Sequence, residues 1–252
     1  MRPPLRIAIL ECDTPPDDII AKLGRYRDVF TNLLHAAADA LGQPDLISSK
    51  QGLELSYYEV VTAQEYPDID NIDAILMTGS RHDSFDDSPW ILKLVEFTKK
   101  VLEQDRVRII GVCFGHQIIG RAAGVKVGRS DGGWEISVLP VELTKKGKEL
   151  FKQDKLSLHQ MHQDIVFECP EGAENLGASP RCLVQGMYKK GKYISVQGHP
   201  EFNETIVSIL VEMRQEQGVF PDELARDALD RVGNHHDGVA VASAFLRFLL
   251  ED

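Results

Sequence analysis

The sequence predicts an α/β fold with a doubly wound, mostly parallel central sheet, antiparallel additions and C-terminal helices. Three observations support this prediction. In the first half of the chain, apolar β-branched runs alternate with segments of helical spacing, which is the pattern of βαβ units. Between residues 125 and 193 the runs become short and alternate in polarity, as antiparallel strands do. After residue 201 the spacing is helical.

The first three strands are expected in the N-terminal third of the chain. Residues 5–10 form an apolar strand that is followed by a Pro-rich loop. Apolar positions at helical spacing predict a helix over residues 26–41, and the Gly and Pro that follow are expected to end it. A strand over residues 53–61 is expected beside the first. Residues 74–79 are apolar throughout, as strands covered on both faces should be.

A fourth strand is expected between two helices. Ser88 suits a helix N-cap and Pro89 suits the first helical position, so a helix is predicted over residues 89–104. The strand follows over residues 107–112, and a short helix over residues 115–123 comes directly after it. The alternation of strand and helix therefore continues up to this point of the chain.

The second half of the chain is expected to complete the same domain. Its short alternating runs cover residues 136–143, 165–168, 181–188 and 193–197. A hairpin turn at residues 189–191 is expected to join the last two. Helices are expected over residues 203–217, 221–232 and 237–250. The prediction is a single domain over residues 1–252, with a core over about 5–205 and a helical C-terminal extension over 203–252.

The segment Gly111-Val112-Cys113-Phe114-Gly115 lies where the fourth strand meets the following helix. It has the Gly-x-nucleophile-x-Gly pattern of a strand-to-helix elbow, with cysteine as the nucleophile. The glycines leave room for a tight turn, and the helix N-terminus favours thiolate over thiol. A buried structural cysteine is the alternative, so this segment alone does not decide between the two.

A second segment supplies the partners that a nucleophile needs. The strand over residues 193–197 leads into Gly198-His199-Pro200-Glu201. Residues two apart in extended backbone point to the same side, so Glu201 can reach the ring of His199. Nucleophile, base and orienting carboxylate together form a triad. His116 is closer to Cys113 in sequence, but His199 is the expected base because Glu201 orients it.

The two segments together resemble a known family. Gly111-Val112-Cys113-Phe114-Gly115-His116-Gln117 and Gln197-Gly198-His199-Pro200-Glu201 resemble the class I glutamine amidotransferases. The resemblance runs from residue 5 to about residue 205 and implies the flavodoxin-like fold of that family. It also implies that Cys113, His199 and Glu201 are a catalytic triad of the Cys-His-Glu type.

Within this family the chain is similar to the stand-alone γ-glutamyl peptidases of plants. The similar segments are Gly79-Ser80-Arg81-His82-Asp83-Ser84-Phe85, Trp90-Ile91-Leu92-Lys93-Leu94 and His162-Gln163-Asp164. The broader family usually has Gly-Gly-Pro where this chain has Gly79-Ser80-Arg81. Because this loop borders the pocket, the departure argues against glutamine as the preferred substrate.

The resemblance also implies roles for residues around the triad. The backbone N–H groups of Gly79 and Phe114 would form the oxyanion hole. Gln117, one helical turn after the nucleophile, would bind the α-amino and carboxylate end of the substrate. Met161 and His162 belong to the loop that would clasp the glutamyl moiety, and Asp164 would cap or brace that loop.

These roles predict a cysteine-dependent hydrolase of γ-glutamyl amide bonds that forms a γ-glutamyl thioester. The leading interpretation is a stand-alone γ-glutamyl peptidase for glutathione-type substrates or conjugates, whose leaving-group carboxylate would pair with Arg81. The alternative is a glutaminase subunit that delivers ammonia to a partner synthetase. The intact triad argues against a non-catalytic regulatory protein. Phe114 argues against a thiol sensor, in which a histidine directly follows the cysteine.

Composition narrows the partners and the compartment. A net charge of −11 argues against nucleic acid or anionic membranes as partners, and the substrate is expected to be a small molecule. No stretch reaches the length of a membrane span, and no signal peptide is expected at the N-terminus. The four cysteines lack paired spacing, so a reduced, cytoplasmic location is expected.

No metal and no cofactor are expected. His159 and His162 stand three apart, and His235-His236-Asp237 groups three potential ligands, but a metal site needs more convergence than this. Asp237 is expected instead to be a helix N-cap. The acidic residues 83–87 are expected to form a solvated loop, with a lid over the pocket as the second interpretation.

Overall fold

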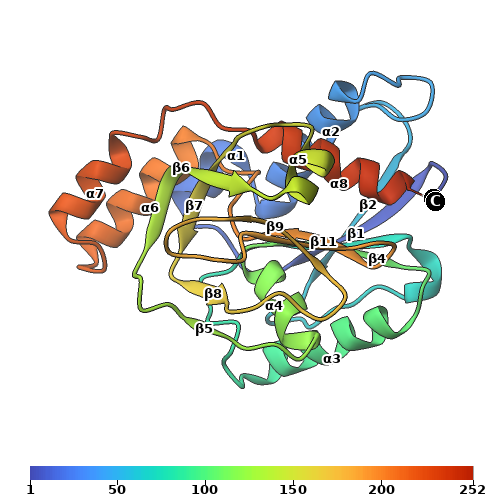
Figure 1. Ribbon diagram of the computed structural model, residues 1–252, viewed down its shortest axis with the longest axis horizontal. Coiled ribbons are helices and arrows are strands. Elements are labelled where there is room, and N and C mark those ends of the chain that lie inside the picture. The colour runs from blue at the N-terminus through green and yellow to red at the C-terminus, as the bar shows by residue number, and fades with distance from the viewer. Residues whose placement is uncertain (252) are drawn as a thin grey trace.

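A nine-stranded sheet forms the centre of the computed structural model, which describes residues 1–251 (Figure 1). Its strand order is β2-β1-β3-β4-β11-β10-β9-β6-β7. The first five strands pair in parallel and are β2 (Leu53–Glu59), β1 (Leu5–Glu11), β3 (Ala74–Met77), β4 (Arg108–Val112) and β11 (Tyr193–Val196). The predicted doubly wound α/β fold is confirmed, and the first two strands are neighbours as expected.

Antiparallel strands extend the parallel part of the sheet on one side. They are β10 (Gly186–Lys189), β9 (Glu174–Ala178), β6 (Glu135–Leu143) and β7 (Leu156–His162). β5 (Val127–Arg129) and β8 (Asp164–Val166) form a separate antiparallel pair. The expectation that residues 193–197 join this antiparallel part needs correction, because β11 also pairs in parallel with β4. The expected strand over 181–188 begins only at Gly186.

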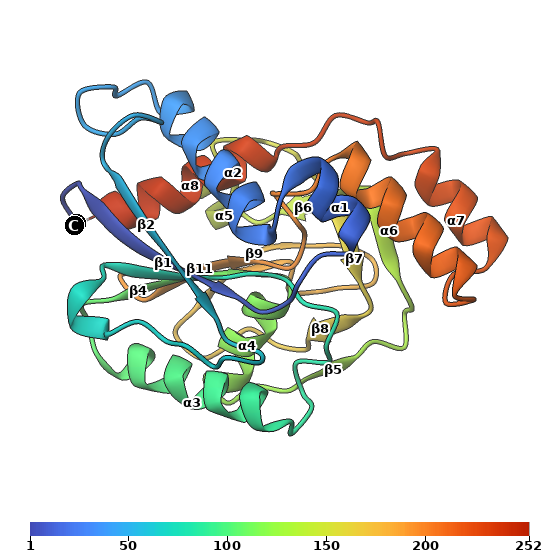
Figure 2. The same ribbon diagram turned by 180° about the vertical axis from the view of Figure 1, so that it is seen from behind.

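Helices cover both faces of the sheet (Figures 1 and 2). On one face lie α2 (Tyr26–Ala40) and α8 (Gly238–Leu250), and on the other lie α3 (Pro89–Glu103) and α4 (Phe114–Ala122). The remaining helices are α1 (Asp17–Leu23), the 3₁₀ turn η1 (Ile69–Asn71), α5 (Lys145–Phe151), α6 (Glu204–Glu216) and α7 (Asp222–Leu229). Among residues 1–251 no helix combines the length and the apolar character needed to cross a membrane.

Alternating side chains of the parallel strands pack into two separate hydrophobic clusters. In β1, Ile7 and Ile9 pack with Phe30 of α2, whereas Leu10 packs with Leu94 of α3. Successive side chains of a strand point to opposite faces, so a sheet covered on both sides needs apolar residues at every position. This explains why the strands predicted as apolar throughout lie at the centre of the sheet.

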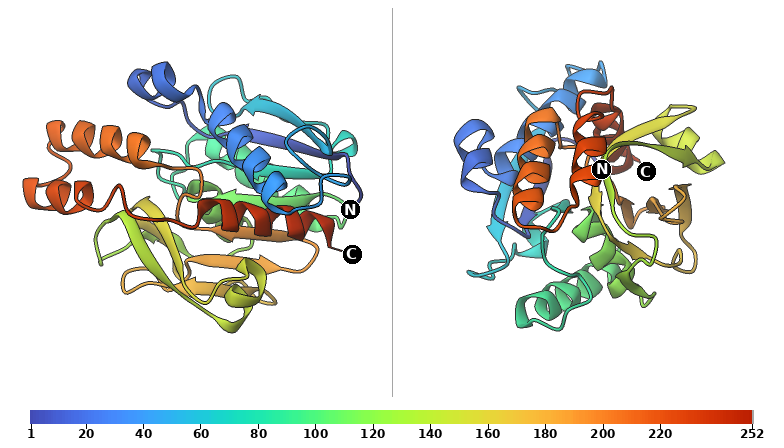
Figure 3. Two further views of the ribbon diagram at one scale, coloured as in Figure 1. Left: turned by 90° about the horizontal axis from the view of Figure 1, so that it is seen from above. Right: turned by 90° about the vertical axis from the view of Figure 1, so that its left-hand side faces the viewer.

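The C-terminal helices begin close to their predicted positions. Two predicted N-cap residues, Asp237 of α8 and Ser88 of α3, stand at the cap position but bond to other groups than the helix end. The side chain of Asn203 caps α6 by accepting a hydrogen bond from the N–H of Ile206. Asp237 stands at the N-cap of α8, yet its carboxylate accepts from the N–H of Ser157. Ser88 stands at the N-cap of α3, but its hydroxyl bonds to Asp86. α6 and α7 lie side by side and extend beyond the sheet (Figure 3).

Candidate active site

Cys113 lies in a strained turn between β4 and α4. Its backbone has φ 51° and ψ −100°, in the region that residues other than glycine rarely adopt. A Cβ at Gly111 would lie 2.8 Å from the carbonyl of Gly115, and one at Gly115 would lie 2.5 Å from the carbonyl oxygen of Met77. The two flanking glycines are therefore required by close backbone packing, as the elbow pattern predicts.

The carboxyl ends of four parallel strands bring the candidate residues together. Asp13 follows β1, Gly79 follows β3, Cys113 follows β4 and His199 follows β11. β7 reaches the same place, because the N–H of His199 donates to the carbonyl of His159 at 2.8 Å. The site therefore lies at the edge where ligands bind in sheets of this kind.

His199 and Glu201 form the expected buried pair. Their Nδ1 and Oε1 atoms are 2.8 Å apart, and both side chains are at most 5% exposed. The ring of Phe202 stacks on the imidazole with centroids 3.9 Å apart and an interplanar angle of 8°. Nε2 of His199 is buried and has no hydrogen-bond partner among residues 1–251. The carboxylate and the phenyl ring thus fix the imidazole and leave one nitrogen for chemistry.

The charges around His199 favour its protonated form. Burial disfavours the imidazolium and would lower the pKa of His199. The negative charges of Cys113 and Glu201 outweigh burial and raise this pKa to about 10. An imidazolium beside a cysteine favours the thiolate, and the thiolate is the reactive form of the side chain. The arrangement therefore places a protonated imidazole beside Cys113 at neutral pH.

His116 has a different environment, although it lies close to the nucleophile in sequence. It is fully buried, and its Nδ1 lies 2.9 Å from the hydroxyl of Ser195. Burial and the neighbouring His162 lower the pKa of His116 to about 3. A ring that stays neutral and is held against β11 serves packing, which agrees with the choice of His199 as the expected base.

Gln117 lies in the wall of a small cavity that also contains Cys113. Its Nε2 donates to the carbonyl of Asp164 at 2.8 Å and to Oε1 of Gln197 at 3.2 Å. Gln197 in turn approaches the sulfur of Cys113 with its Nε2 at 3.6 Å. The amide of Gln117 is therefore held in a fixed orientation beside Cys113, one helical turn away as the spacing predicts.

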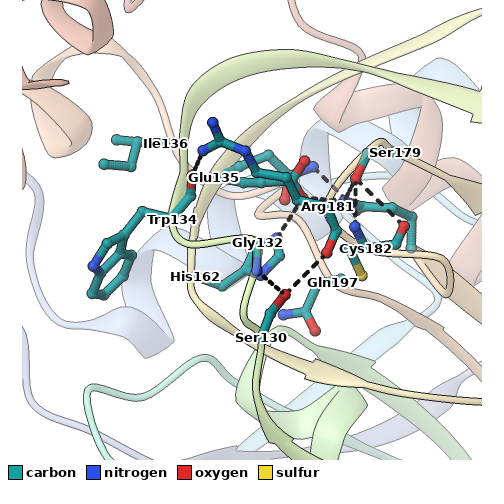
Figure 4. Close-up of polar contacts among 12 residues, drawn as sticks. Ser130, Gly132, Trp134, Glu135, Ile136, His162, Ser179, Arg181, Cys182 and Gln197 are labelled. Atoms are coloured by element: carbon teal, nitrogen blue, oxygen red, sulfur yellow. Dashed lines mark hydrogen bonds and ion pairs between the residues drawn. The ribbon is translucent and has the colours of Figure 1, made fainter.

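Met161 and His162 end β7 at the same cavity. Nε2 of His162 lies 3.1 Å from the carboxylate of Glu135 (Figure 4). Its Nδ1 lies 3.2 Å from the carbonyl of Asp164. Burial would raise the pKa of Glu135, but the contact with His162 lowers it below its usual range. The ring of His162 thus lies between the carboxylate of Glu135 and the carbonyl of Asp164, and we expect it to hold the loop in place.

Arg81 borders the site, but its guanidinium is already occupied. Nε of Arg81 donates to both carboxylate oxygens of Asp13 at 2.9 and 3.1 Å, and Nη2 donates to the carbonyl of Thr14 at 2.6 Å. The forked geometry that the sequence suggested for a substrate carboxylate is therefore taken up by an internal carboxylate. Forked binding of a substrate carboxylate by Arg81 would require this pair to open.

The acidic loop over residues 83–87 is exposed at Phe85, Asp86 and Asp87, as the solvated loop expected from the sequence should be, and arginines hold its two ends. Arg121 of α4 pairs with Asp87 at 2.6 Å and donates to the carbonyl of Ser84. Arg129 of β5 pairs with Asp83 at 2.8 Å. The loop is fixed at both ends, and Asp83 lines the small cavity.

A larger cavity of about 260 Å³ adjoins the small one. It reaches His199 and Glu201, and its apolar wall includes Leu210 and Met213 of α6 together with Tyr26 of α2. The residues that line both cavities are Ser80, Arg81, Met161 and Arg214. Cys113 therefore borders the small cavity, and His199 borders the larger one.

Two residues of the site were not predicted from the sequence. Asp13 lies in the loop after the first strand, and the rule that ligands bind beyond strand carboxyl ends points to that loop. Arg214 lies in α6, where nothing in the helical pattern distinguishes it from a solvated residue. Its place in the cavity depends on how the C-terminal helices pack, which the local sequence does not specify.

The family model for class I glutamine amidotransferases matches residues 46–208 of the chain. A glutamine amidotransferase-like protein of Schizosaccharomyces pombe is 38% identical over 250 residues, which cover 97% of this chain and 98% of that one. γ-Glutamyl peptidase 2 of Arabidopsis thaliana is 31% identical over 227 residues, with coverage of 87% and 85%. The crystal structure of a glutamine amidotransferase from Methylobacillus flagellatus matches with a TM-score of 0.70 and 18% identity, and covers 98% of this chain and 96% of that one.

Proposed function

Because the chain belongs to the class I glutamine amidotransferase family, we propose that it hydrolyses γ-glutamyl amide bonds through a thioester on Cys113. The proposal is supported by the strained turn that presents Cys113 and by the buried pair of His199 and Glu201. It is also supported by the resemblance to γ-glutamyl peptidases, which extends over most of the chain.

The reaction proceeds in two steps. The thiolate of Cys113 attacks the γ-carbonyl carbon, and the carbon–nitrogen bond breaks as the imidazolium of His199 gives its proton to the leaving amine. Water then attacks the thioester while the neutral imidazole accepts a proton from it, and the sulfur leaves as glutamate forms. Glu201 keeps the imidazole oriented and stabilises its positive charge in both steps.

The oxyanion of each tetrahedral intermediate would be bound by the backbone N–H groups of Gly79 and Phe114. Neither group donates a hydrogen bond to another residue within 1–251. Phe114 is the first residue of α4, so its N–H belongs to the helix end that carries positive partial charge. Two such donors would each stabilise the intermediate, with a contribution of roughly 10²–10³-fold in rate.

Gly79→Ala is expected to lower kcat/KM for a γ-glutamyl substrate roughly 10²-fold with little change in thermal stability. An added Cβ would lie 2.7 Å from Cε1 of His199 and so push the imidazole out of line. The matched control is Gly233→Ala, whose Cβ would meet nothing closer than 3.7 Å. Steady-state kinetics and thermal unfolding of both variants test this, and unchanged activity of Gly79→Ala would mean that His199 is not held in its reactive position by this close contact.

The size of the cavity beside His199 favours a leaving group larger than ammonia. Ammonia occupies about the volume of a water molecule, roughly 30 Å³, whereas this cavity measures about 260 Å³. The departing amine receives its proton from His199, so the group attached to that amine would lie in this larger cavity. We therefore favour a γ-glutamyl peptidase, whose leaving group is an amino acid or a short peptide, over a glutaminase.

The substrates to compare are glutamine, γ-glutamylcysteine and glutathione, each incubated with the purified protein while mass spectrometry identifies the released amine. We expect kcat/KM to be at least about tenfold higher for the γ-glutamyl peptides, because contacts in the larger cavity orient the scissile amide. Faster turnover of glutamine, or activity that appears only with an added partner synthetase, would support the glutaminase subunit instead.

A further inference from the structure

Arg214 lies in the last turn of α6 and lines both cavities of the site. Its guanidinium carbon is 5.0 Å from the centroid of the Trp134 ring and 5.5 Å from that of Phe220. The two rings meet edge to face, with centroids 5.1 Å apart. Aromatic contacts of this kind hold a guanidinium in place without using its N–H groups.

The backbone at Trp134 is held by polar contacts of the loop before β6. The guanidinium of Arg181 donates to the carbonyl of Trp134, and the hydroxyl of Ser130 bonds to the carbonyl of Arg181 and to the N–H of Gly132. Figure 4 shows the indole turned away from these contacts. The surface on which Arg214 rests is therefore fixed by the fold.

Within residues 1–251 Arg214 has no carboxylate at ion-pair distance, and its Nη1 is buried without a hydrogen-bond partner. Burial lowers the pKa of Arg214 from its ordinary value. Leaving a buried charged donor unsatisfied costs folding free energy, so such a group usually has a function. Nε and Nη2 of Arg214 also make no hydrogen bond within residues 1–251 and are not buried, so they are the donors that can meet a ligand in the cavities.

The neighbouring carboxylates do not supply the missing partner. Asp13 is bound by Arg81, Glu201 by His199 and Asp164 by Arg129. Each of these carboxylates already has a partner for its charge within the protein. Among the arginines within residues 1–251 that line the two cavities, Arg214 is therefore the one without a carboxylate partner, and it remains free to bind an anion from outside.

We propose that Arg214 binds the carboxylate of the leaving amino acid or peptide, an inference that rests on the proposed γ-glutamyl hydrolase function. The ligand class is a γ-glutamyl peptide whose amine-side residue carries a free carboxylate. Arg214 shares the larger cavity with His199, the donor of the proton to the leaving amine, and with apolar Leu210 and Met213. A planar guanidinium with free N–H groups is suited to forked binding of a carboxylate.

This assignment gives Arg214 the role that sequence similarity suggested for Arg81. Nε and Nη2 of Arg81 donate to Asp13 and Thr14, whereas the guanidinium of Arg214 has no hydrogen-bond partner within residues 1–251. Arg214 comes from the helical extension that follows the triad, so α6 acquires a function as part of the substrate site. The amine-side specificity of the enzyme would then depend on a segment that contributes nothing to the bond-breaking chemistry.

The test uses a substrate pair that differs in one group, γ-glutamylcysteine and the same dipeptide with its C-terminal carboxylate converted to an amide. Arg214→Met is expected to lower kcat/KM for the acid roughly 10- to 100-fold, the range of a charge-assisted hydrogen bond, and to leave the amide nearly unchanged. Arg214→Lys keeps the charge but loses the fork, so an intermediate loss is expected. Arg226→Met removes an exposed arginine of α7 and is the charge-matched control.

The outcomes separate the inference from the function on which it rests. If the wild-type protein cleaves neither dipeptide, the proposed function fails and the inference fails with it. If the wild type cleaves both and Arg214→Met loses both equally while its thermal unfolding is unchanged, Arg214 binds the glutamyl part and the inference is wrong. Equal activity of wild type and variant on the acid also overturns it.

Discussion

Cys113→Ser is expected to lower turnover of a γ-glutamyl substrate by roughly 10³-fold or more while the protein stays folded. A serine hydroxyl is far less ionised than a thiol at neutral pH, so the attacking group is almost absent. Serine is close to cysteine in size, and the turn at φ 51° is imposed by the packing of Gly111 and Gly115. Steady-state kinetics test the loss, and circular dichroism with thermal unfolding tests the fold.

The remaining cysteines provide an internal control for this prediction. Burial raises the pKa of Cys12 and of Cys182 to about 12, and it also raises the pKa of Cys169. A glutamine-analogue electrophile should therefore label Cys113 and spare the other three, as peptide mapping by mass spectrometry can show. Equal labelling of two or more cysteines would contradict an activated thiolate at Cys113.

His199→Ala is expected to have the second-largest effect, a loss of roughly 10²–10⁴-fold in kcat/KM. The variant lacks both the cation that stabilises the thiolate and the proton donor for the leaving amine. Glu201→Gln keeps the size of the side chain and removes its charge, so a smaller loss is expected, with kcat lowered more than KM is raised. Wild-type activity in Glu201→Gln would leave Glu201 with only a structural role.

The raised pKa of His199 predicts how activity depends on pH. The imidazolium of His199 is favoured below the raised pKa of about 10 and is lost above it, so activity should fall on the alkaline side. Glu201→Gln removes one of the two negative charges that raise this pKa, so the alkaline fall of kcat/KM should move to lower pH. An unshifted profile would show that the fall belongs to another group.

Much of the fold could be predicted because the residues that begin and end its strands and helices act through local geometry. The third strand is apolar throughout because its two faces pack into different clusters, and Pro89 opens α3 at the first helical position. The elbow was predictable for a similar reason, since Gly111 and Gly115 are both required by close backbone contacts. In these places the residue type follows directly from the local geometry.

The elements that were missed owe their sequence to distant contacts. β7 lacks apolar alternation because His159, Gln160 and His162 are buried at the site, where the carbonyl of His159 binds the N–H of His199. α5 contains Gly147, an unfavourable residue for a helix. A Cβ there would lie 1.9 Å from the carbonyl oxygen of Leu176, so the tertiary packing explains the glycine.

The candidate site divides in the same way. Cys113, His199 and Glu201 could be named from two short segments because the spacing within each segment sets the geometry. Arg81 was expected to face the substrate, but Asp13, at the end of another strand, binds it. Arg214 could not be named at all, since its position depends on how α6 packs over the carboxyl ends of the strands.

The most direct test of covalent catalysis by Cys113 is to trap the acyl-enzyme. Wild-type protein mixed with γ-glutamylcysteine and quenched in acid within the first turnovers should carry one glutamyl group on the peptide that contains Cys113, as tandem mass spectrometry can locate. The adduct should be absent from Cys113→Ser and should disappear when the quenched protein is treated with hydroxylamine, which cleaves thioesters. Turnover by the wild type without any such adduct, or with the glutamyl group on a different residue, would contradict covalent catalysis by Cys113.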